Sequence, residues 1–415
     1  MRILSHFLQQ MIRVGTLDLT DAYGTRHRFQ GGPGPASAIR LHDPSLHWRL
    51  ATNPRLALGE AFMDGTLTIE GGDLYGFLDL CAINYNGFAG HPLAKLGIGL
   101  GWLTRRLRQV NPIGRARRNV AHHYDLSDEF YELFLDNDRQ YSCGYFASED
   151  DALLQAQENK KRHIAAKLLL QPGMKVLDIG CGWGGMALFL AEHCGAEVLG
   201  ITLSEHQLAV ARQRAESKGL SGRVRFALTD YRQVEGRFDR IVSVGMFEHV
   251  GVPQYRQFFE KVRALLPEEG VALLHSIGCM WGPHPIDPWI AKYVFPGGYI
   301  PALSEVMPPV EDSGLFATDV ELLYPHYAQT LRAWRERFMA NRDAAARLYD
   351  ERFCRMWEYY LVCSEIAFRR LNHMVFQMQL ARDPFVVPPT RDYIGETERD
   401  LKPLRPTLVP DRATG

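Results

Sequence analysis

Apolar runs, each closed by glycine or polar residues, recur through the middle of the chain. They occupy residues 176–179, 197–202, 224–228, 238–244 and 270–275. Because the strands of a parallel sheet buried on both faces read as continuous apolar runs, these segments predict such a sheet. Helix-like stretches lie between them, beginning with residues 186–193, and this alternation is typical of an α/β domain.

A glycine-rich turn, Gly-Cys-Gly-Trp-Gly at residues 180–184, follows the first run. Glycine allows a tight turn and lets the backbone approach a ligand where a Cβ would collide. Gly180, Gly182 and Gly185 also satisfy the G-x-G-x-x-G spacing of a dinucleotide site. The turn therefore predicts a nucleoside-binding site, and the spacing alone does not say which nucleoside.

The end of the second run argues against a dinucleotide. Such a site usually carries a carboxylate about 20 residues after the glycines, where it holds the ribose hydroxyls. Here Thr202, Ser204 and Gln207 offer neutral hydrogen-bonding groups, and Glu197 lies too early in the strand. NAD is disfavoured, although S-adenosylmethionine is not thereby proved.

Several polar residues directly follow the predicted strands. Ligands of open α/β sheets bind outside the carboxyl ends of the strands. We therefore expect the glycine turn, residues 202–207, Tyr231, Glu248 and His275 to lie together at one edge of the sheet.

Further motifs stand on both sides of the glycine turn. They are Ala-His-His-Tyr-Asp-Leu-Ser at 121–127, Tyr-Ser-Cys-Gly-Tyr-Phe at 141–146, Phe-Glu-His-Val-Gly at 247–251, His-Ser-Ile-Gly at 275–278, Phe-Pro-Gly-Gly at 295–298, Pro-His-Tyr-Ala-Gln-Thr-Leu at 325–331 and Tyr-Leu at 360–361. With these motifs the chain resembles the cyclopropane-fatty-acyl-phospholipid synthase family, which includes the mycolic acid cyclopropane synthases. The similarity covers about residues 118–380.

The resemblance implies a Rossmann-like class I methyltransferase domain of α/β type, a small α+β N-terminal domain, and inserted helices over the active site. It also implies S-adenosylmethionine as the cofactor. The residues expected to bind this cofactor are Tyr141, Ser142, Asp178, Gly180, Gly182, Gly184, Thr202, Leu203, Ser204, Gln207, Tyr231 and Arg232.

The implied chemistry is demanding, because a carbon–carbon double bond is a poor nucleophile and its methylation leaves a carbocation. The site must be dry, stabilise positive charge and contain a weak base. In the family this base is a bound bicarbonate ion. The residues that match its binding site are Cys143, Glu248, His275, Tyr327 and the main chain near Ile277. No metal is expected.

Each of these residues also has an ordinary structural interpretation when taken alone. An isolated Cys143 is more often a buried inert thiol, and His275 after an apolar strand is more often a core histidine. Glu248 is harder to dismiss, because a buried carboxylate without partners is costly. In the last helix, cysteine stands at 363, one place earlier than the family pattern, with Ser364 at the expected position. We therefore leave Cys363 out of the predicted site.

The first hundred residues predict a separate domain. Short strands are expected at 15–19, 26–30, 38–41 and 65–70, and a helix at 47–63. Gly-Glu-Ala-Phe-Met-Asp-Gly at 59–65 is similar to full-length bacterial cyclopropane synthases, which implies a lipid-engaging domain. A domain that only stabilises a dimer or covers the active site remains an alternative.

The predicted organisation is a lipid-engaging domain at 1–105, a basic linker at 106–120, a catalytic domain at 121–385 and a proline-rich tail at 386–415. Residues 91–103 are mostly apolar and six arginines follow by residue 118. Such a cluster suits anionic lipid headgroups, although a solvated linker explains it equally well. Because the expected substrate is a membrane phospholipid, we predict reversible peripheral contact with the inner face of the membrane.

Composition supports this organisation. The chain has 415 residues, 46% of them hydrophobic, which is ample for two domains. A formal net charge of −1 argues against nucleic acid as a partner. The seven cysteines lack C-x-x-C pairs and zinc spacing, so we expect a reducing cytoplasmic setting. No apolar stretch approaches the roughly 20 residues of a membrane-spanning helix. A homodimer is the family expectation.

Two segments after the last predicted strand have a recognisable composition or spacing. Residues 279–304 are rich in aromatic residues, glycine and proline, and predict a lid or channel for an acyl chain, with ordinary packing as the alternative. Residues 341–380 predict a long helical stretch that belongs to the core.

Four functions remain open at this stage. The favoured one is cyclopropanation of unsaturated phospholipid acyl chains. A related methyltransferase would give a methyl-branched or methylated unsaturated chain from the same carbocation. A catalytically silent lipid-binding protein fits poorly with four intact polar positions, and an NAD oxidoreductase is the weakest alternative.

Overall fold

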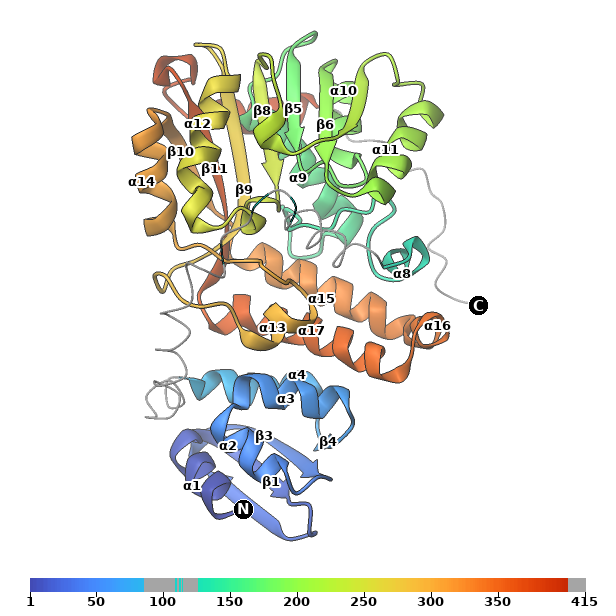
Figure 1. Cartoon of the computed structure of the whole chain (residues 1–415), viewed down its shortest axis with the longest axis vertical. Coiled ribbons are helices and arrows are strands. Elements are labelled where there is room, and N and C mark those ends of the chain that lie inside the picture. Colours follow the sequence, from blue (N-terminus) through green and yellow to red (C-terminus); the bar gives the residue numbers. More distant parts are fainter. Residues whose placement is uncertain (86–108, 110–111, 113, 115–125, 402–415) are drawn as a thin grey trace.

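The computed structural model of the chain describes residues 1–85, 109, 112, 114 and 126–401. Within them, two β-sheets lie at opposite ends of the molecule with a layer of helices between them (Figure 1). The predicted 91–103 segment, most of the basic linker and the His-His-Tyr-Asp motif fall outside the described residues. In the described part of the chain, every helix is too short or too polar to cross a membrane.

The N-terminal sheet has the order β2-β1-β3-β4. Its strands are β1 (Val14–Thr20), β2 (Arg26–Gln30), β3 (Gly32–Leu41) and β4 (Leu67–Gly71), and its helices are α1 (Arg2–Met11), α2 (Leu46–Thr52), α3 (Pro54–Met63) and α4 (Leu74–Ile83). This unit is of the predicted α+β type. The single helix expected at 47–63 is wrong, because the chain breaks at Asn53 (φ −141°, ψ 60°). A residue before proline is disfavoured in the helical region, and Pro54 then starts the next helix.

The second sheet has seven strands in the order β10-β11-β9-β8-β5-β6-β7. The five predicted strands are present as β5 (Lys175–Ile179), β6 (Glu197–Thr202), β7 (Val224–Leu228), β8 (Arg240–Val244) and β9 (Val271–Cys279). All five are parallel, which confirms the predicted α/β class. Strand β9 runs further than expected and carries Ile277 to the edge of the sheet.

Helices cover this sheet and short helices sit at its edge (Figure 1). They are α8 (Asp128–Glu132), α9 (Leu153–Lys167), α10 (Gly185–Cys194), α11 (Glu205–Ser217), α12 (Tyr255–Leu265), α14 (Leu303–Ser313) and the 3-10 turns η1 (Tyr231–Gln233), η2 (Phe247–His249), η3 (Val252–Gln254) and η4 (Pro384–Val386).

The predicted helical stretch at 341–380 is wrong in its last part. Helices α16 (Arg342–Leu348) and α17 (Glu351–Arg370) are followed by a strand, β11 (His373–Ala381). It lies between β9 and β10 (Phe316–Leu322) and is antiparallel to both. Because β11 is buried on both faces, its sequence lacks the alternation that would have marked it as a strand.

The layer between the sheets consists of α13 (Pro288–Tyr293), α15 (Tyr324–Ala340) and α17 (Figure 1). Helices α3 and α4 of the N-terminal unit pack directly against α17, and α3 also packs against α13. A single core cluster accordingly runs from the N-terminal sheet through α17 to the segment before α9.

The 59–65 motif lies at this contact. A Cβ on Gly59 would come within 2.4 Å of the Trp289 indole. Glu60 accepts hydrogen bonds from Lys292 Nζ at 2.7 Å and from the Tyr293 hydroxyl at 2.9 Å. The motif therefore joins the N-terminal unit to α13.

The expected tail begins with ordered structure. Helix α18 (Asp392–Asp400) packs against α9. Glu398 Oε1 lies 2.6 Å from His163 Nδ1. Residues 402–415 fall outside the described part of the chain.

Candidate active site

The glycine turn lies at the carboxyl end of β5, where the chain reverses into α10. Gly180, Gly182 and Gly184 have φ angles of 85°, 54° and 85°, which residues with a Cβ rarely adopt. A Cβ on Gly180 would meet Met246 at 2.8 Å, and one on Gly184 would meet Phe226 at 2.7 Å. Gly182 faces open space instead. The turn is therefore tightly packed against Met246 and Phe226, and at Gly182 it leaves room for a ligand.

A cavity of about 150 Å³ opens over this turn. Ten of the twelve predicted cofactor residues line it: Tyr141, Ser142, Asp178, Gly180, Gly182, Thr202, Leu203, Gln207, Tyr231 and Arg232. The other two, Gly184 and Ser204, lie at helix starts. Gly184 precedes α10, and Ser204 caps α11 by accepting a hydrogen bond from Gln207 N at 3.2 Å.

Asp178 lines this cavity with a buried carboxyl group. Its Oδ2 is buried and has no hydrogen-bond partner among the described residues. Burial raises the pKa of Asp178 to about 7. Since an unpartnered buried carboxylate is costly, a ligand with a donor or a positive charge would be favoured here. S-adenosylmethionine carries an amino group, hydroxyl groups and a sulfonium, so these residues fit it.

The Tyr231-Arg232 pair lines the cavity beyond β7. Arg232 Nε and Nη2 both donate at 2.7 Å to the carboxylate of Asp230. The Tyr231 ring packs edge-on against Phe258, with centroids 5.2 Å apart. Asp230, which sequence analysis did not select, thus orients Arg232. A carboxylate two residues after the end of an apolar strand was the available signal.

A second cavity of about 450 Å³ adjoins the first. All five predicted catalytic residues line it: Cys143, Glu248, His275, Ile277 and Tyr327. They come from the segment before α9, from η2, from β9 and from α15. The fold thus brings together residues that are up to 184 positions apart, as the numbers of Cys143 and Tyr327 show (327 − 143).

Glu248 is oriented by the main chain of β9. The Ile277 amide donates to Glu248 Oε1 at 2.7 Å. Glu248 Oε2 is buried and has no hydrogen-bond partner among the described residues. Burial raises the pKa of Glu248 to about 7. Near neutral pH this carboxyl group can therefore either accept or donate a proton.

His275 and Cys143 are held in their neutral forms. The Gln377 amide nitrogen of β11 lies 3.2 Å from His275 Nδ1, and a donor at that position leaves the ring proton on Nε2. Burial lowers the pKa of His275 to about 3 and raises the pKa of the Cys143 thiol. His275 Nε2 is thus a hydrogen-bond donor for an anion, whereas the Cys143 thiol donates to the Gly144 carbonyl at 3.3 Å. Neither side chain is a charged nucleophile.

The two cavities share part of their walls. Tyr141, Ser142, Gly245 and His249 line both of them. The polar cavity over the glycine turn and the largely apolar cavity beside Glu248 therefore meet at these four residues. His249 was not selected from the sequence, although it directly follows Glu248.

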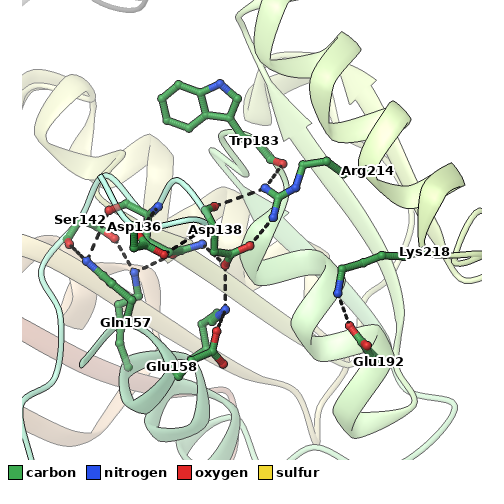
Figure 2. A network of polar contacts seen from close by, with 12 residues as sticks. Asp136, Asp138, Ser142, Gln157, Glu158, Trp183, Glu192, Arg214 and Lys218 are labelled. Atoms are coloured by element: carbon green, nitrogen blue, oxygen red, sulfur yellow. Dashed lines mark hydrogen bonds and ion pairs between the residues drawn. The ribbon is translucent and has the colours of Figure 1, made fainter. Parts of the chain in front are cut away.

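A buried cation supports this shared wall. Lys160 of α9 is fully buried, and its Nζ donates to Gln140 Oε1 at 2.6 Å and to Ser142 Oγ at 2.7 Å. Gln157 donates to the Ser142 carbonyl at 2.9 Å (Figure 2). Burial lowers the pKa of Lys160 to about 8. These contacts fix the position of Ser142 from below.

The same network reaches the glycine turn (Figure 2). Asp138 accepts hydrogen bonds from Lys161 and Arg214. Arg214 Nη1 also donates to the Trp183 carbonyl at 2.8 Å. No motif marks this network in the sequence, because Gln157, Lys160 and Lys161 look like ordinary surface positions of a polar helix.

Cys363, which we left out of the predicted site, and the 279–304 segment also lie on the larger cavity. Cys363 lines it from α17, and burial raises the pKa of its thiol, which makes it a poor nucleophile. From the 279–304 segment, Trp281, Trp289, Phe295 and Tyr299 line the same cavity. This segment therefore forms part of the cavity wall.

Comparison with known proteins gives a consistent set of relatives. Residues 113–378 match the family model described as mycolic acid cyclopropane synthetase. The chain is 39% identical to cyclopropane-fatty-acyl-phospholipid synthase of Escherichia coli K12 over 357 residues, which cover 85% of this chain and 89% of that protein. It is 37% identical to a probable fatty acid methyltransferase of Pseudomonas putida over 352 residues, which cover 83% and 86% of the two chains.

A solved structure agrees with the catalytic part of the fold. The mycolic acid cyclopropane synthase CmaA1, in complex with SAH (S-adenosylhomocysteine) and CTAB, superposes with a TM-score of 0.61 at 35% identity. The match covers 66% of this chain and 99% of that one.

Proposed function

Since the chain belongs to the mycolic acid cyclopropane synthetase family, we propose that it closes cyclopropane rings on unsaturated phospholipid acyl chains. It is an S-adenosylmethionine-dependent methyltransferase of fatty acyl chains. The observation that carries the proposal is the shared wall at Tyr141, Ser142, Gly245 and His249. A polar cofactor and an apolar chain could meet there without passing through water.

The reaction transfers one carbon in two steps. When bound, S-adenosylmethionine would supply an electrophilic methyl group: the π electrons of the double bond would form the new carbon–carbon bond as the carbon–sulfur bond breaks and its electron pair stays on sulfur. A carbocation remains on the acyl chain. A base then removes a proton from the new methyl group, and the released C–H electron pair closes the ring.

The protein must keep water away from this carbocation. The larger cavity is lined by aromatic side chains, including Tyr141, Phe295 and Tyr360. Aromatic faces stabilise cations, and a dry site prevents capture of the cation by water. The Tyr141 hydroxyl lies 3.0 Å from that of Tyr360, so these two rings hold one another in place.

We also propose that bicarbonate is held beside Glu248. The neutral His275 ring offers a donor, Cys143 and Tyr327 line the same cavity, and the unpartnered Glu248 Oε2 suits a hydroxyl donor such as the one bicarbonate carries. When bound, bicarbonate would supply the weak base. Removal of carbon dioxide from the buffer should then lower turnover, and added bicarbonate should restore it. Equal turnover in both buffers would reject this part of the proposal.

The phospholipid form of the substrate implies contact with a membrane. The Escherichia coli relative is a cyclopropane-fatty-acyl-phospholipid synthase, and an acyl chain in a bilayer must reach the enzyme. Reversible binding at the inner face of the membrane and a homodimer remain predictions. Co-sedimentation with anionic vesicles would test the first, and light scattering would test the second.

The proposed function is tested with purified protein, S-adenosylmethionine and vesicles of unsaturated phospholipid. We expect fatty acids that have gained one CH2 and lost the double bond. Absence of any acyl product, with cofactor bound, would reject a phospholipid substrate.

A second candidate is favoured by the Pseudomonas putida relative, a probable fatty acid methyltransferase of nearly equal identity. The same carbocation could lose a different proton and give a methylated unsaturated chain. Its mass equals that of the cyclopropane product. A double bond that survives in the product would support this candidate.

Glu248→Gln tests the assignment of the carboxylate. We expect turnover to fall about 100-fold or more, because the amide cannot exchange a proton, while S-adenosylhomocysteine still binds. Glu358→Gln is the matched control, since Glu358 is a largely buried carboxyl group on α17 that does not line either cavity. Near-normal turnover in Glu248→Gln would show that this carboxylate is not catalytic.

A further inference from the structure

The larger cavity does not end in the catalytic part of the chain. Besides Glu248 and His275, it is lined by residues of the N-terminal unit. We define the distal wall as Phe7, Leu8, Leu17, Leu19 and Ile39, which all line the cavity. Both ends therefore belong to one continuous space.

The distal wall is built from the core face of the N-terminal unit. Phe7 and Leu8 lie on the apolar face of α1, while Leu17 and Leu19 are two positions apart on β1. Side chains two apart on a strand point to the same face. Leu19 is paired with Ile39 of the neighbouring strand. All five side chains are at least 90% shielded from solvent, so the wall lies inside the domain.

The middle of the cavity is formed where the two parts of the chain meet. Cys81 of α4, Trp289 of α13 and Tyr359 and Cys363 of α17 line it. Helix α17 packs against α3 and α4 and lies between the two sheets in Figure 1. The path from Glu248 to the distal wall therefore crosses the contact between the N-terminal unit and the catalytic unit.

The chemistry of the distal wall selects its occupant. Its five side chains are hydrocarbon only, so a phosphate or ester group would lose its hydration there without compensation. The charged pair on the cavity, Arg55 and Asp287, is joined by a contact of 3.1 Å between Arg55 Nε and Asp287 Oδ2. The distal wall thus suits the methyl end of an acyl chain and excludes a glycerophosphate headgroup.

An unused void would be unusual at this place. Protein interiors are close-packed and contain few voids larger than a water molecule. This cavity measures about 450 Å³, which lies within the range of ligand pockets. Its size and its connection to Glu248 indicate that it is a binding site.

We infer that the core of the N-terminal unit receives the methyl end of the acyl chain, and that Leu19 and Ile39 limit the number of carbons beyond the double bond. The inference rests on the proposed function, because the reacting double bond must lie beside Glu248. The N-terminal unit then selects substrates by the length of the acyl chain beyond the double bond, in addition to any contact it makes with a membrane.

The test uses three phospholipids that separate the two sides of the double bond. Oleoyl and cis-vaccenoyl chains are equally long, but the double bond of cis-vaccenoyl lies two carbons nearer the methyl end. A palmitoleoyl chain has the same number of carbons as cis-vaccenoyl between the double bond and the methyl end. Between the carboxyl group and the double bond it has the same number as oleoyl. In mixed vesicles, Ile39→Phe should lower turnover of oleoyl relative to cis-vaccenoyl about tenfold or more, and palmitoleoyl should follow cis-vaccenoyl.

Leu41→Phe is the matched control. Leu41 lies two residues further on the same strand and is equally buried, but does not line the cavity. It should leave the ratio unchanged. Leu19→Ala deepens the cavity and should raise the relative turnover of oleoyl. Thermal unfolding and S-adenosylhomocysteine binding show whether each variant is folded.

Two results would overturn the inference. One is an unchanged oleoyl to cis-vaccenoyl ratio in both Ile39→Phe and Leu19→Ala. The other is a selective loss of cis-vaccenoyl turnover in Ile39→Phe, which would place the carboxyl side of the chain in the N-terminal unit.

A binding experiment separates this inference from the proposed function. A phospholipid with a photoreactive diazirine at the methyl end of its acyl chain should label residues 1–41 of the wild-type protein, whether or not transfer occurs. Labelling there without any transfer would retain the placement of the methyl end in the N-terminal unit and reject the proposed function. Labelling confined to residues beyond 126 would reject the inference.

Discussion

At the residue scale, the site consists of buried polar groups whose ionisation is shifted by their surroundings. Glu248 and Asp178 each keep one unpartnered carboxylate oxygen, and burial raises both pKa values to about 7. His275 and Cys143 are neutral for the same reason. Each cavity therefore contains one buried carboxylate oxygen that lacks a partner within the described chain, which is the property expected where a ligand completes the hydrogen bonding.

The buried Glu248 should make stability depend on pH. Its pKa is raised from 4.5 to about 7, so the folded state binds the proton more tightly than the unfolded state. The stabilisation is fully present below pH 4.5 and is lost as the pH rises through 7. The free energy of unfolding of Glu248→Gln should not fall with pH in this way, because the amide does not ionise. Above pH 7 this variant should therefore be more stable than the wild type by up to about 3 kcal/mol.

Denaturant unfolding of both proteins at a series of pH values measures this difference. Parallel stability curves for wild type and Glu248→Gln from pH 5 to 8 would mean that the carboxyl group is solvated in the folded protein. The same variant should lose turnover, so function and stability would move in opposite directions.

Motifs identified from the sequence locate the residues that carry charge or protons. They do not locate the neighbouring residues that orient these side chains by hydrogen bonds. Cys143, Glu248, His275 and Tyr327 were selected from the sequence and line one cavity. Their neighbours were not: Gln377 is 102 positions from His275 and lies on a strand expected to be helical. Lys160 was missed because nothing in a run of polar helical residues marks the buried one.

At the element scale, the parallel strands were predictable and the antiparallel strand was not. Each parallel strand ends in glycine or polar residues at the ligand edge, which gives it a local signal. Strand β11 forms because it pairs with β9 and β10. Such non-local pairing leaves no periodicity in the sequence. The break between α2 and α3 was readable at Pro54 and was overlooked within an otherwise helical composition.

The contact between α3 and α13 gives a prediction at this scale. Gly59→Ala places a Cβ 2.4 Å from the Trp289 indole. Alanine has a higher helix propensity than glycine, so the variant should be more stable unless this collision dominates. We expect overpacking to dominate and to destabilise the protein by about 1–3 kcal/mol.

Thermal unfolding is the measurement, with Gly32→Ala as the control. Gly32 is exposed, and a Cβ there would meet no atom closer than 3.7 Å. An unfolding temperature for Gly59→Ala equal to or above that of the wild type would mean that α3 does not pack on Trp289 as described.

At the scale of the whole molecule, two sheets from different parts of the chain contribute residues to one cavity. The seven-stranded sheet presents the glycine turn and Glu248 at the carboxyl ends of its strands, and residues of the four-stranded sheet line the far end of the larger cavity. The sequence predicted both units and the α/β class of the second. It could not predict that their cores join, because this depends on how α3, α4 and α17 pack across a segment without a distinctive motif.

Ring closure requires the loss of one proton from the transferred methyl group. Incubation with S-adenosylmethionine that carries a trideuterated methyl, together with unsaturated phospholipid vesicles, measures this loss. We expect an acyl product that retains two of the three deuterons and contains no double bond. A product with all three deuterons, or one that is still unsaturated, would contradict ring closure.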